Sequence, residues 1–112
     1  MKQSQPVYLK LRDLIAASII DGTYPEGAML PSVRAFAAEQ GANPLTVAKA
    51  YQLFQLEDLV EVQRGVGLFV AKGAAERLRR SERAAFLAEE WPAIQARITR
   101  LGLQASDLLA EC

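Results

Sequence analysis

The stretch "LPSVRAFAAEQGANPLTVAKAYQLF", residues 30–54, predicts two short helices separated by a tight turn. Ser32 suits the cap of the first helix and Gly41 its end. Asn43-Pro44 suits the start of the second helix, because Asn caps a helix and Pro fits its first turn. On a wheel of about 100° per residue, the second helix gathers its apolar core face from four side chains: Val47, Ala50, Tyr51 and Phe54.

The segments on either side of this pair complete a recognisable order. Residues 7–21 have apolar side chains at helical spacing and are followed by Gly22, so they predict a helix that ends there. Residues 60–70 alternate apolar and polar positions around Gly65-Val66-Gly67, which predicts a β-hairpin. A helix, a tight helix pair and a hairpin together predict a mainly α-helical fold with a small β-hairpin wing, the winged helix-turn-helix.

The composition changes at Gly73, where a segment rich in Ala, Glu, Arg and Leu begins. We therefore expect two parts, a winged helix-turn-helix over residues 1–72 and a C-terminal helical dimerisation arm over residues 73–112. Pro92 lies inside the arm, where we favour one kinked helix over two separate helices. Ser106 is expected to cap a last short turn. A heptad-like seam in the arm is expected to pair two copies of the chain, through Leu87, Trp91, Ile94, Ile98 and Leu101.

The overall composition excludes several classes of protein. The 112 residues carry 13 basic and 13 acidic side chains, so nucleic-acid binding has to use a local patch. There is no histidine and one cysteine, Cys112, so we expect no internal disulfide, no catalytic centre, no metal and no cofactor. The start "MKQSQPVYLKL" does not resemble a signal peptide, and no apolar run could span a membrane. We expect a cytoplasmic protein with no membrane contact, and we assign no small-molecule effector.

Residues 6–71 resemble the DNA-binding domain of the GntR family of bacterial transcription regulators. The resemblance is carried mainly by residues 30–71, "LPSVRAFAAEQGANPLTVAKAYQLFQLEDLVEVQRGVGLFVA". The segment "NPLTVAKAYQ" and the short helical tail are similar to the YtrA subfamily, which suggests a repressor of transporter operons. The chain departs from the family at Pro44 and Ala48, where arginine is frequent, and at Leu45, where a polar residue is common. The resemblance implies DNA contacts from the helix pair and the wing, by Arg34, Asn43, Thr46, Lys49, Arg64, Gly65 and Gly67.

Two further residues join this set for physical reasons. Ser32 begins a helix whose N-terminus favours phosphate. Leu45 faces away from the core, where it can touch a thymine methyl group or be an ordinary exposed leucine. For Arg34, Thr46 and Lys49 the alternative is an ordinary surface residue, and we favour the DNA contact at each; the glycines could serve turn geometry alone.

We therefore expect a homodimeric, sequence-specific regulator that binds an inverted repeat in double-stranded DNA, and no enzyme. One alternative is a winged-helix module that binds proteins rather than DNA, which zero net charge permits. A second is the regulatory part of a fused enzyme, since GntR-like domains also precede aminotransferase-like domains. The start at Met1 and the expected capped final turn favour the stand-alone regulator.

Overall fold

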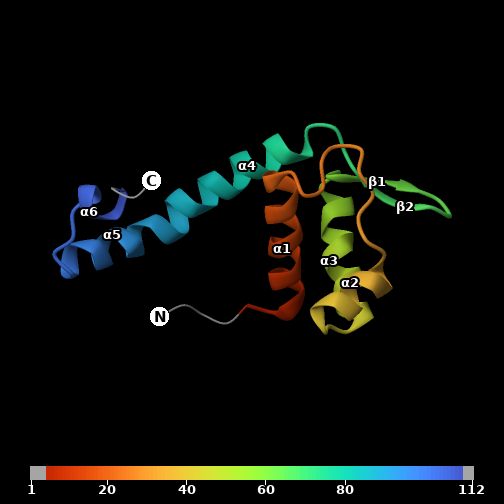
Figure 1. Ribbon diagram of the computed structural model, residues 1–112, viewed down its shortest axis with the longest axis horizontal. Coiled ribbons are helices and arrows are strands. Elements are labelled where there is room, and N and C mark those ends of the chain that lie inside the picture. The colour runs from red at the N-terminus through yellow and green to blue at the C-terminus, as the bar shows by residue number, and fades with distance from the viewer. Residues whose placement is uncertain (1–4, 110–112) are drawn as a thin grey trace. The chain divides into compact units, whose positions relative to one another are not determined.

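A computed structural model describes residues 5–109, and Cys112 lies outside these residues. The chain divides into two compact units, Met1–Leu78 and Arg79–Cys112. In Figure 1 the elements follow one another as α1 (Val7–Asp21), α2 (Val33–Gln40), α3 (Pro44–Leu56), β1 (Val60–Gln63), β2 (Gly67–Val70), α4 (Ala74–Ala85), the π-helix η1 (Phe86–Glu90), α5 (Trp91–Arg100) and α6 (Ala105–Leu109).

Three helices form the core of the first unit, and α1 and α3 run side by side in it (Figure 1). The predicted face of α3 is buried, and Val47 and Phe54 have no exposed surface. Helix α1 adds Leu11, Ile15 and Ile19, while Val7 at its start stays exposed. The turn between α2 and α3 is short because Gly41 takes a left-handed conformation, with φ of 63°, that glycine adopts without strain. The predicted winged helix-turn-helix is confirmed.

The wing is an antiparallel hairpin in which Val60 pairs with Val70 and Gln63 with Gly67. The segment 27–30, which precedes α2, adds to the free edge of β2. The Leu30 N–H donates to the Leu68 carbonyl at 2.9 Å, and the Val70 N–H donates to the Ala28 carbonyl at 2.9 Å. Main-chain hydrogen bonds therefore attach the hairpin to the segment that leads into α2, in addition to the chain connections at the two ends of the hairpin.

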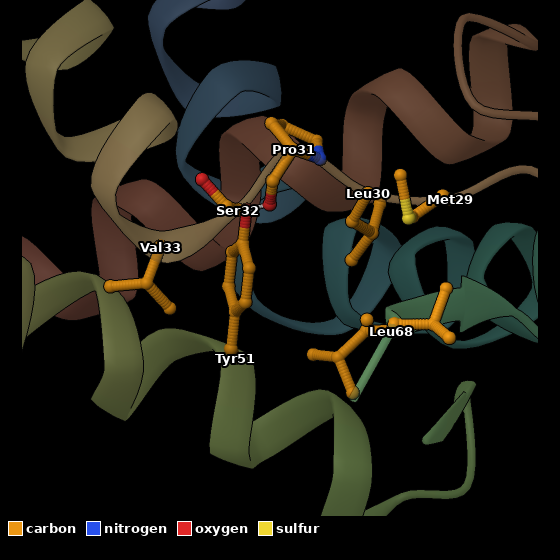
Figure 2. Close-up of a pocket in the computed structure, with 9 residues that line it drawn as sticks. Met29, Leu30, Pro31, Ser32, Val33, Tyr51 and Leu68 are labelled. Carbon is orange, nitrogen blue, oxygen red and sulfur yellow. Dashed lines mark hydrogen bonds between the residues drawn. The ribbon is translucent and has the colours of Figure 1, made fainter. Parts of the chain in front are cut away.

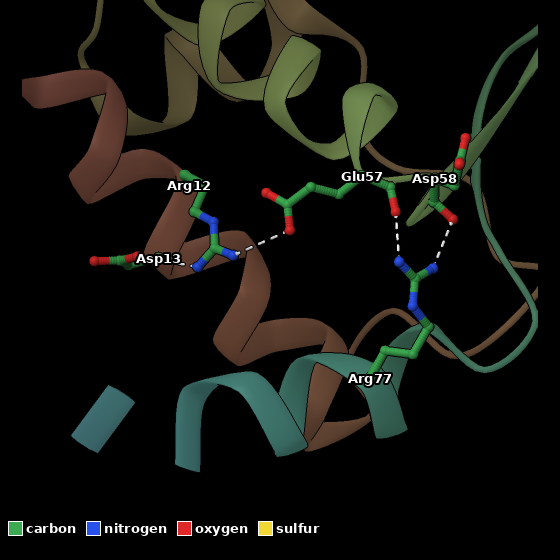
Figure 3. Close-up of polar contacts among 5 residues, drawn as sticks. All are labelled: Arg12, Asp13, Glu57, Asp58 and Arg77. Carbon is green, nitrogen blue, oxygen red and sulfur yellow. Dashed lines mark hydrogen bonds and ion pairs between the residues drawn. The ribbon is translucent and has the colours of Figure 1, made fainter. Parts of the chain in front are cut away.

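Two arginines hold the end of α3 in place, as Figure 3 shows. The Arg77 guanidinium, from α4, donates to the Glu57 carbonyl at 2.6 Å and to the Asp58 carbonyl at 3.1 Å. These bonds satisfy carbonyl groups at the helix end that have no partner inside the helix. Arg12, from α1, lies 5.7 Å from the centre of the Phe54 ring and 4.0 Å from the Glu57 carboxylate. Both cations thus stabilise the fold and are not available to a ligand.

The first compact unit continues beyond the boundary expected after Lys72. Ala74 and Leu78, in the first two turns of α4, are 0% and 1% exposed and belong to the core that α1 and α3 build. The Gly73 N–H also donates to the Glu26 carboxylate from the loop after α1. The structural division therefore falls after Leu78, because the apolar face at the start of α4 completes the first core.

The arm remains helical through Pro92, as expected, and the irregularity is a π turn. The Trp91 N–H donates to the Phe86 carbonyl, five residues earlier, so the turn before the proline is wider than an α-helical turn. A wider turn accommodates Pro92, because proline has no N–H to donate and its ring crowds the carbonyl of the preceding turn. At the C-terminal end, the expected cap is wrong. Helix α6 begins at Ala105, and the Asp107 carboxylate accepts the Gln104 N–H at 2.9 Å.

We expect Leu78→Ala to lower the free energy of unfolding by about 2–5 kcal/mol, because it opens a cavity in the core of the first unit. Leu56→Ala is the matched control, since Leu56 is 80% exposed and should change this free energy by less than about 0.5 kcal/mol. Urea denaturation followed by circular dichroism, at one protein concentration, measures both. Equal effects from the two variants would place Leu78 outside the core.

Candidate nucleic-acid interface

The N-terminus of α2 is an open, capped helix end. The Ser32 hydroxyl accepts the Ala35 N–H at 3.1 Å, as the sequence predicts. Arg34 follows in the first turn and is exposed, and within residues 5–109 no carboxylate forms an ion pair with it. An unpaired guanidinium beside helical N–H groups is suited to a phosphate or a base edge.

The N-terminus of α3 has a different character. The Asn43 side-chain carbonyl accepts the Leu45 N–H at 2.8 Å, and Pro44 occupies the first turn. The Leu45 side chain is 79% exposed, whereas Thr46 is half-buried. The first turn of α3 therefore exposes a hydrocarbon side chain rather than a row of donors and acceptors.

Lys49 is held on the side of α3 that meets α1. Its ammonium nitrogen lies 4.1 Å from the centre of the Tyr8 ring, a cation–π contact. The expected DNA contact of Lys49 stays a prediction, and the structure adds that Tyr8 fixes the position of the charge. No local pattern in the sequence indicates this partner, because Tyr8 and Lys49 meet only when α1 packs on α3.

The tip of the wing consists of Arg64, Gly65 and Val66, and Arg64 is exposed there. Gly67 has already entered β2, with φ of 154°, and a Cβ atom at this position would come within 3.0 Å of the Met29 sulfur. Glycine at this position is thus explained by close packing against Met29. A contact of Gly67 with DNA stays a prediction.

A groove of about 260 Å³ lies between the start of α2 and the turn end of the wing, where β2 begins, as Figure 2 shows. On its α3 side, the Tyr51 hydroxyl donates to the Pro31 carbonyl at 2.7 Å and ties α3 to the loop before α2. Burial, with smaller contributions from Tyr24 and Glu39, raises the pKa of Tyr51, so the hydroxyl remains a donor at neutral pH. The groove brings together two residues chosen from the sequence, Ser32 and Gly67. Its other lining residues are mostly apolar: Met29, Leu30, Pro31, Val33, Tyr51, Val66 and Leu68.

Two other features are absent from the part of the chain that the structure describes. No group of three or more Cys, Asp or Glu side chains there could hold a metal ion. None of the helices described is long and apolar enough to cross a bilayer.

A short helix pair with an outward-facing second helix, followed by a hairpin anchored to the pair, defines a winged helix-turn-helix DNA-binding domain. The chain belongs to the gntR family of bacterial regulatory proteins, whose family profile matches residues 7–70. The resemblance seen in the sequence is therefore confirmed.

Curated relatives support the same assignment. The chain is 34% identical over 73 residues to the HTH-type transcriptional repressor YtrA of Bacillus subtilis, a match that covers 65% of this chain and 56% of YtrA. It is also 34% identical over 73 residues to the uncharacterized HTH-type transcriptional regulator YhcF of the same organism, covering 65% of this chain and 60% of YhcF. The chain thus spans somewhat more than half the length of these relatives. Both are transcriptional regulators and not enzymes, as expected for this chain.

Solved structures extend the likeness beyond the first unit. A GntR family transcriptional regulator from Listeria monocytogenes has a TM-score of 0.73 and 28% identity, covering 98% of this chain and 95% of that one. The DNA-binding domain of AraR, in complex with operator ORX1, has a TM-score of 0.58 and 22% identity, covering 63% of this chain and 93% of that one. At this identity the AraR domain shows the shared fold alone.

We expect Ser32→Ala to lower the free energy of unfolding by about 1 kcal/mol, because the Ala35 N–H loses its acceptor. Ser32→Asp restores an acceptor at the same position and should recover most of this stability. Thermal unfolding of the three proteins measures the difference. A destabilisation that Asp does not relieve would show that the hydroxyl does more than cap α2.

Proposed function

We propose that the chain is a sequence-specific DNA-binding transcription regulator, a repressor, that acts in the cytoplasm as a homodimer on an inverted-repeat operator. The observation that carries the proposal is the unpaired Arg34 at the capped start of α2, beside a recognition helix whose outer face is exposed. The names of two similar proteins support it, since YtrA is described as a repressor and the AraR domain is bound to operator DNA.

Few cations are available for phosphate, and this shapes the proposal. Arg12 and Arg77 are engaged within the fold, and Lys10 and Lys72 are exposed but lie outside the helix pair and the wing strands. On the helix pair and the wing, Arg34 and Arg64 are exposed and Lys49 is held against Tyr8. With three phosphate contacts per copy, a plot of the logarithm of the binding constant against the logarithm of the salt concentration should have a slope of about −3 for one copy and about −5 for two. A single copy should bind DNA weakly. Two linked copies should bind far more tightly, because the second copy binds its half-site intramolecularly once the first is bound.

We assign the DNA contacts to two groups of residues. At the helix pair, Ser32 and Arg34 approach phosphate or bases from α2. Asn43, Leu45 and Thr46 border the major groove at the start of α3, and Lys49 contacts phosphate. At the wing, Arg64 contacts phosphate or the minor groove, with Gly65 and Gly67 shaping the hairpin.

We assign dimerisation to the helical arm, residues 79–112. Leu87, Ile94 and Leu101 are 50%, 38% and 60% exposed, and all three belong to the heptad-like seam. Trp91, Ile94 and Ile98 also line an apolar groove of about 520 Å³ between α5 and α6. A second copy of the chain would cover this apolar surface and place two recognition helices on one operator.

Exposed apolar residues on α3 and the wing favour one alternative, a module that binds a protein. The exposed fractions of Leu56, Val62 and Val66 are 80%, 59% and 62%. The two functions differ in their dependence on Arg34, because a phosphate or base contact needs its charge and an apolar protein interface does not.

We expect Arg34→Ala to weaken binding to a selected DNA site by about tenfold or more, since one lost contact costs about 1–3 kcal/mol. Arg83→Ala, which removes an exposed arginine from α4, is the control and should leave affinity unchanged. Fluorescence anisotropy titrations measure affinity, and circular dichroism checks the fold. Equal affinities for the two variants would remove Arg34 from the interface, and absence of DNA binding by the unaltered chain would favour the protein-binding module.

We expect the full chain to sediment as a dimer and Leu87→Glu to sediment as a monomer, because the new charge falls on the apolar seam. The monomer should bind the same DNA on the order of 100-fold more weakly. Ala96→Glu adds the same charge to an exposed position outside the seam and should remain dimeric. A monomeric unaltered chain, or a dimeric Leu87→Glu variant, contradicts the assignment of the arm.

A further inference from the structure

Leu45 is a strongly exposed apolar side chain at the start of the recognition helix. It is 79% exposed, whereas Val47 and Ala50, two and five residues further along the same helix, are completely buried. It follows Pro44 directly, so it lies in the first turn of α3, the part of a recognition helix that reaches base edges. Any DNA held by α3 therefore meets a branched hydrocarbon at this position.

The polar groups around Leu45 are already engaged. The Asn43 side-chain carbonyl accepts the Leu45 N–H at 2.8 Å, and the Asn43 main-chain carbonyl accepts the Thr46 N–H at 2.9 Å. An asparagine reads adenine with its carbonyl and its NH₂ group together, and the Asn43 oxygen is already oriented toward the Leu45 N–H and uses one of its two lone pairs there. Pro44 has no N–H to offer, and Thr46 is half-buried. The first turn of α3 is thus poor in hydrogen-bonding readers.

The chemistry of the major groove identifies what such a turn can recognise. Guanine, cytosine and adenine present hydrogen-bonding atoms there, and an isobutyl group against them would displace water without replacing its hydrogen bonds. Thymine alone presents a methyl group. We propose that Leu45 is a specificity-determining residue that selects thymine in each half-site by packing on its 5-methyl group. This inference rests on the proposed DNA-binding function.

The first stage of the test is selection of binding sites from a pool of random duplex DNA by the full chain. The unaltered chain should enrich thymine at one position of each half-site, and Leu45→Ala should lose that preference while keeping the rest of the site. Leu56→Ala is the matched control, because Leu56 is an equally exposed leucine at the other end of α3. It should enrich the same site as the unaltered chain.

The second stage removes only the methyl group. In the selected duplex, deoxyuridine replaces the enriched thymidine, and affinity is measured for the unaltered chain, Leu45→Ala and Leu56→Ala. The unaltered chain and Leu56→Ala should bind the uracil duplex about fourfold more weakly, the effect of one buried methyl-sized group. Leu45→Ala should bind the two duplexes equally.

The outcomes separate this inference from the function on which it rests. If binding to the selected site depends on Arg34 but is equally tight with uracil at every thymine position, only the role of Leu45 is overturned. The same conclusion follows if Leu45→Ala still discriminates thymine from uracil. If Leu45→Ala leaves every DNA measurement unchanged, the side chain is free for a protein partner and the inference is wrong. If no sequence is enriched at all, the inference and the proposed function both fail.

Discussion

The burial of one face of α3 is the interaction on which the rest of the structure depends. Val47 and Phe54 have no exposed surface, and Tyr51 is 4% exposed with its hydroxyl bound to the Pro31 carbonyl. A helix that is fixed so completely on one side presents its other side rigidly. The same packing that makes the core therefore sets the direction in which the first turn of α3 faces its ligand.

Charge is used sparingly in this protein. Arg77 closes the end of α3, and Arg12 lies between the Phe54 ring and the Glu57 carboxylate, so two of the arginines of the first unit serve the fold. Arg77 comes from α4, and its hydrogen bonds join the helix that leads into the arm to the end of the recognition helix. With zero net charge, any contact with nucleic acid depends on where a few cations lie rather than on the overall field of the chain.

The start of α3 illustrates how capping and recognition compete for the same atoms. The Asn43 side-chain oxygen stabilises the helix by accepting the Leu45 N–H, which uses one of its two lone pairs and fixes its orientation. Pro44 and Ala48 add neither charge nor a side-chain hydrogen-bonding group to this helix. The strongly exposed side chain in its first turn, Leu45, is apolar.

The sequence by itself determined the order of the elements in the first unit, because each signal there is local. Ser32 and Asn43 cap the helices that follow them, Gly41 ends α2, and the apolar spacing of α3 identifies its buried face. The same reasoning placed Leu45 on the outward face of α3, whereas Arg34 was chosen from the family resemblance; both side chains are exposed.

Only the tertiary structure decided which segments complete the core and where charged groups rest. Leu78 lies in a stretch that reads as the start of the arm, yet it is buried by α1 and α3, which are distant in sequence. Lys49 rests on Tyr8, and Arg77 reaches the end of α3, for the same reason. Periodicity and caps report on a few neighbouring residues, whereas these contacts arise only when separate helices share one core.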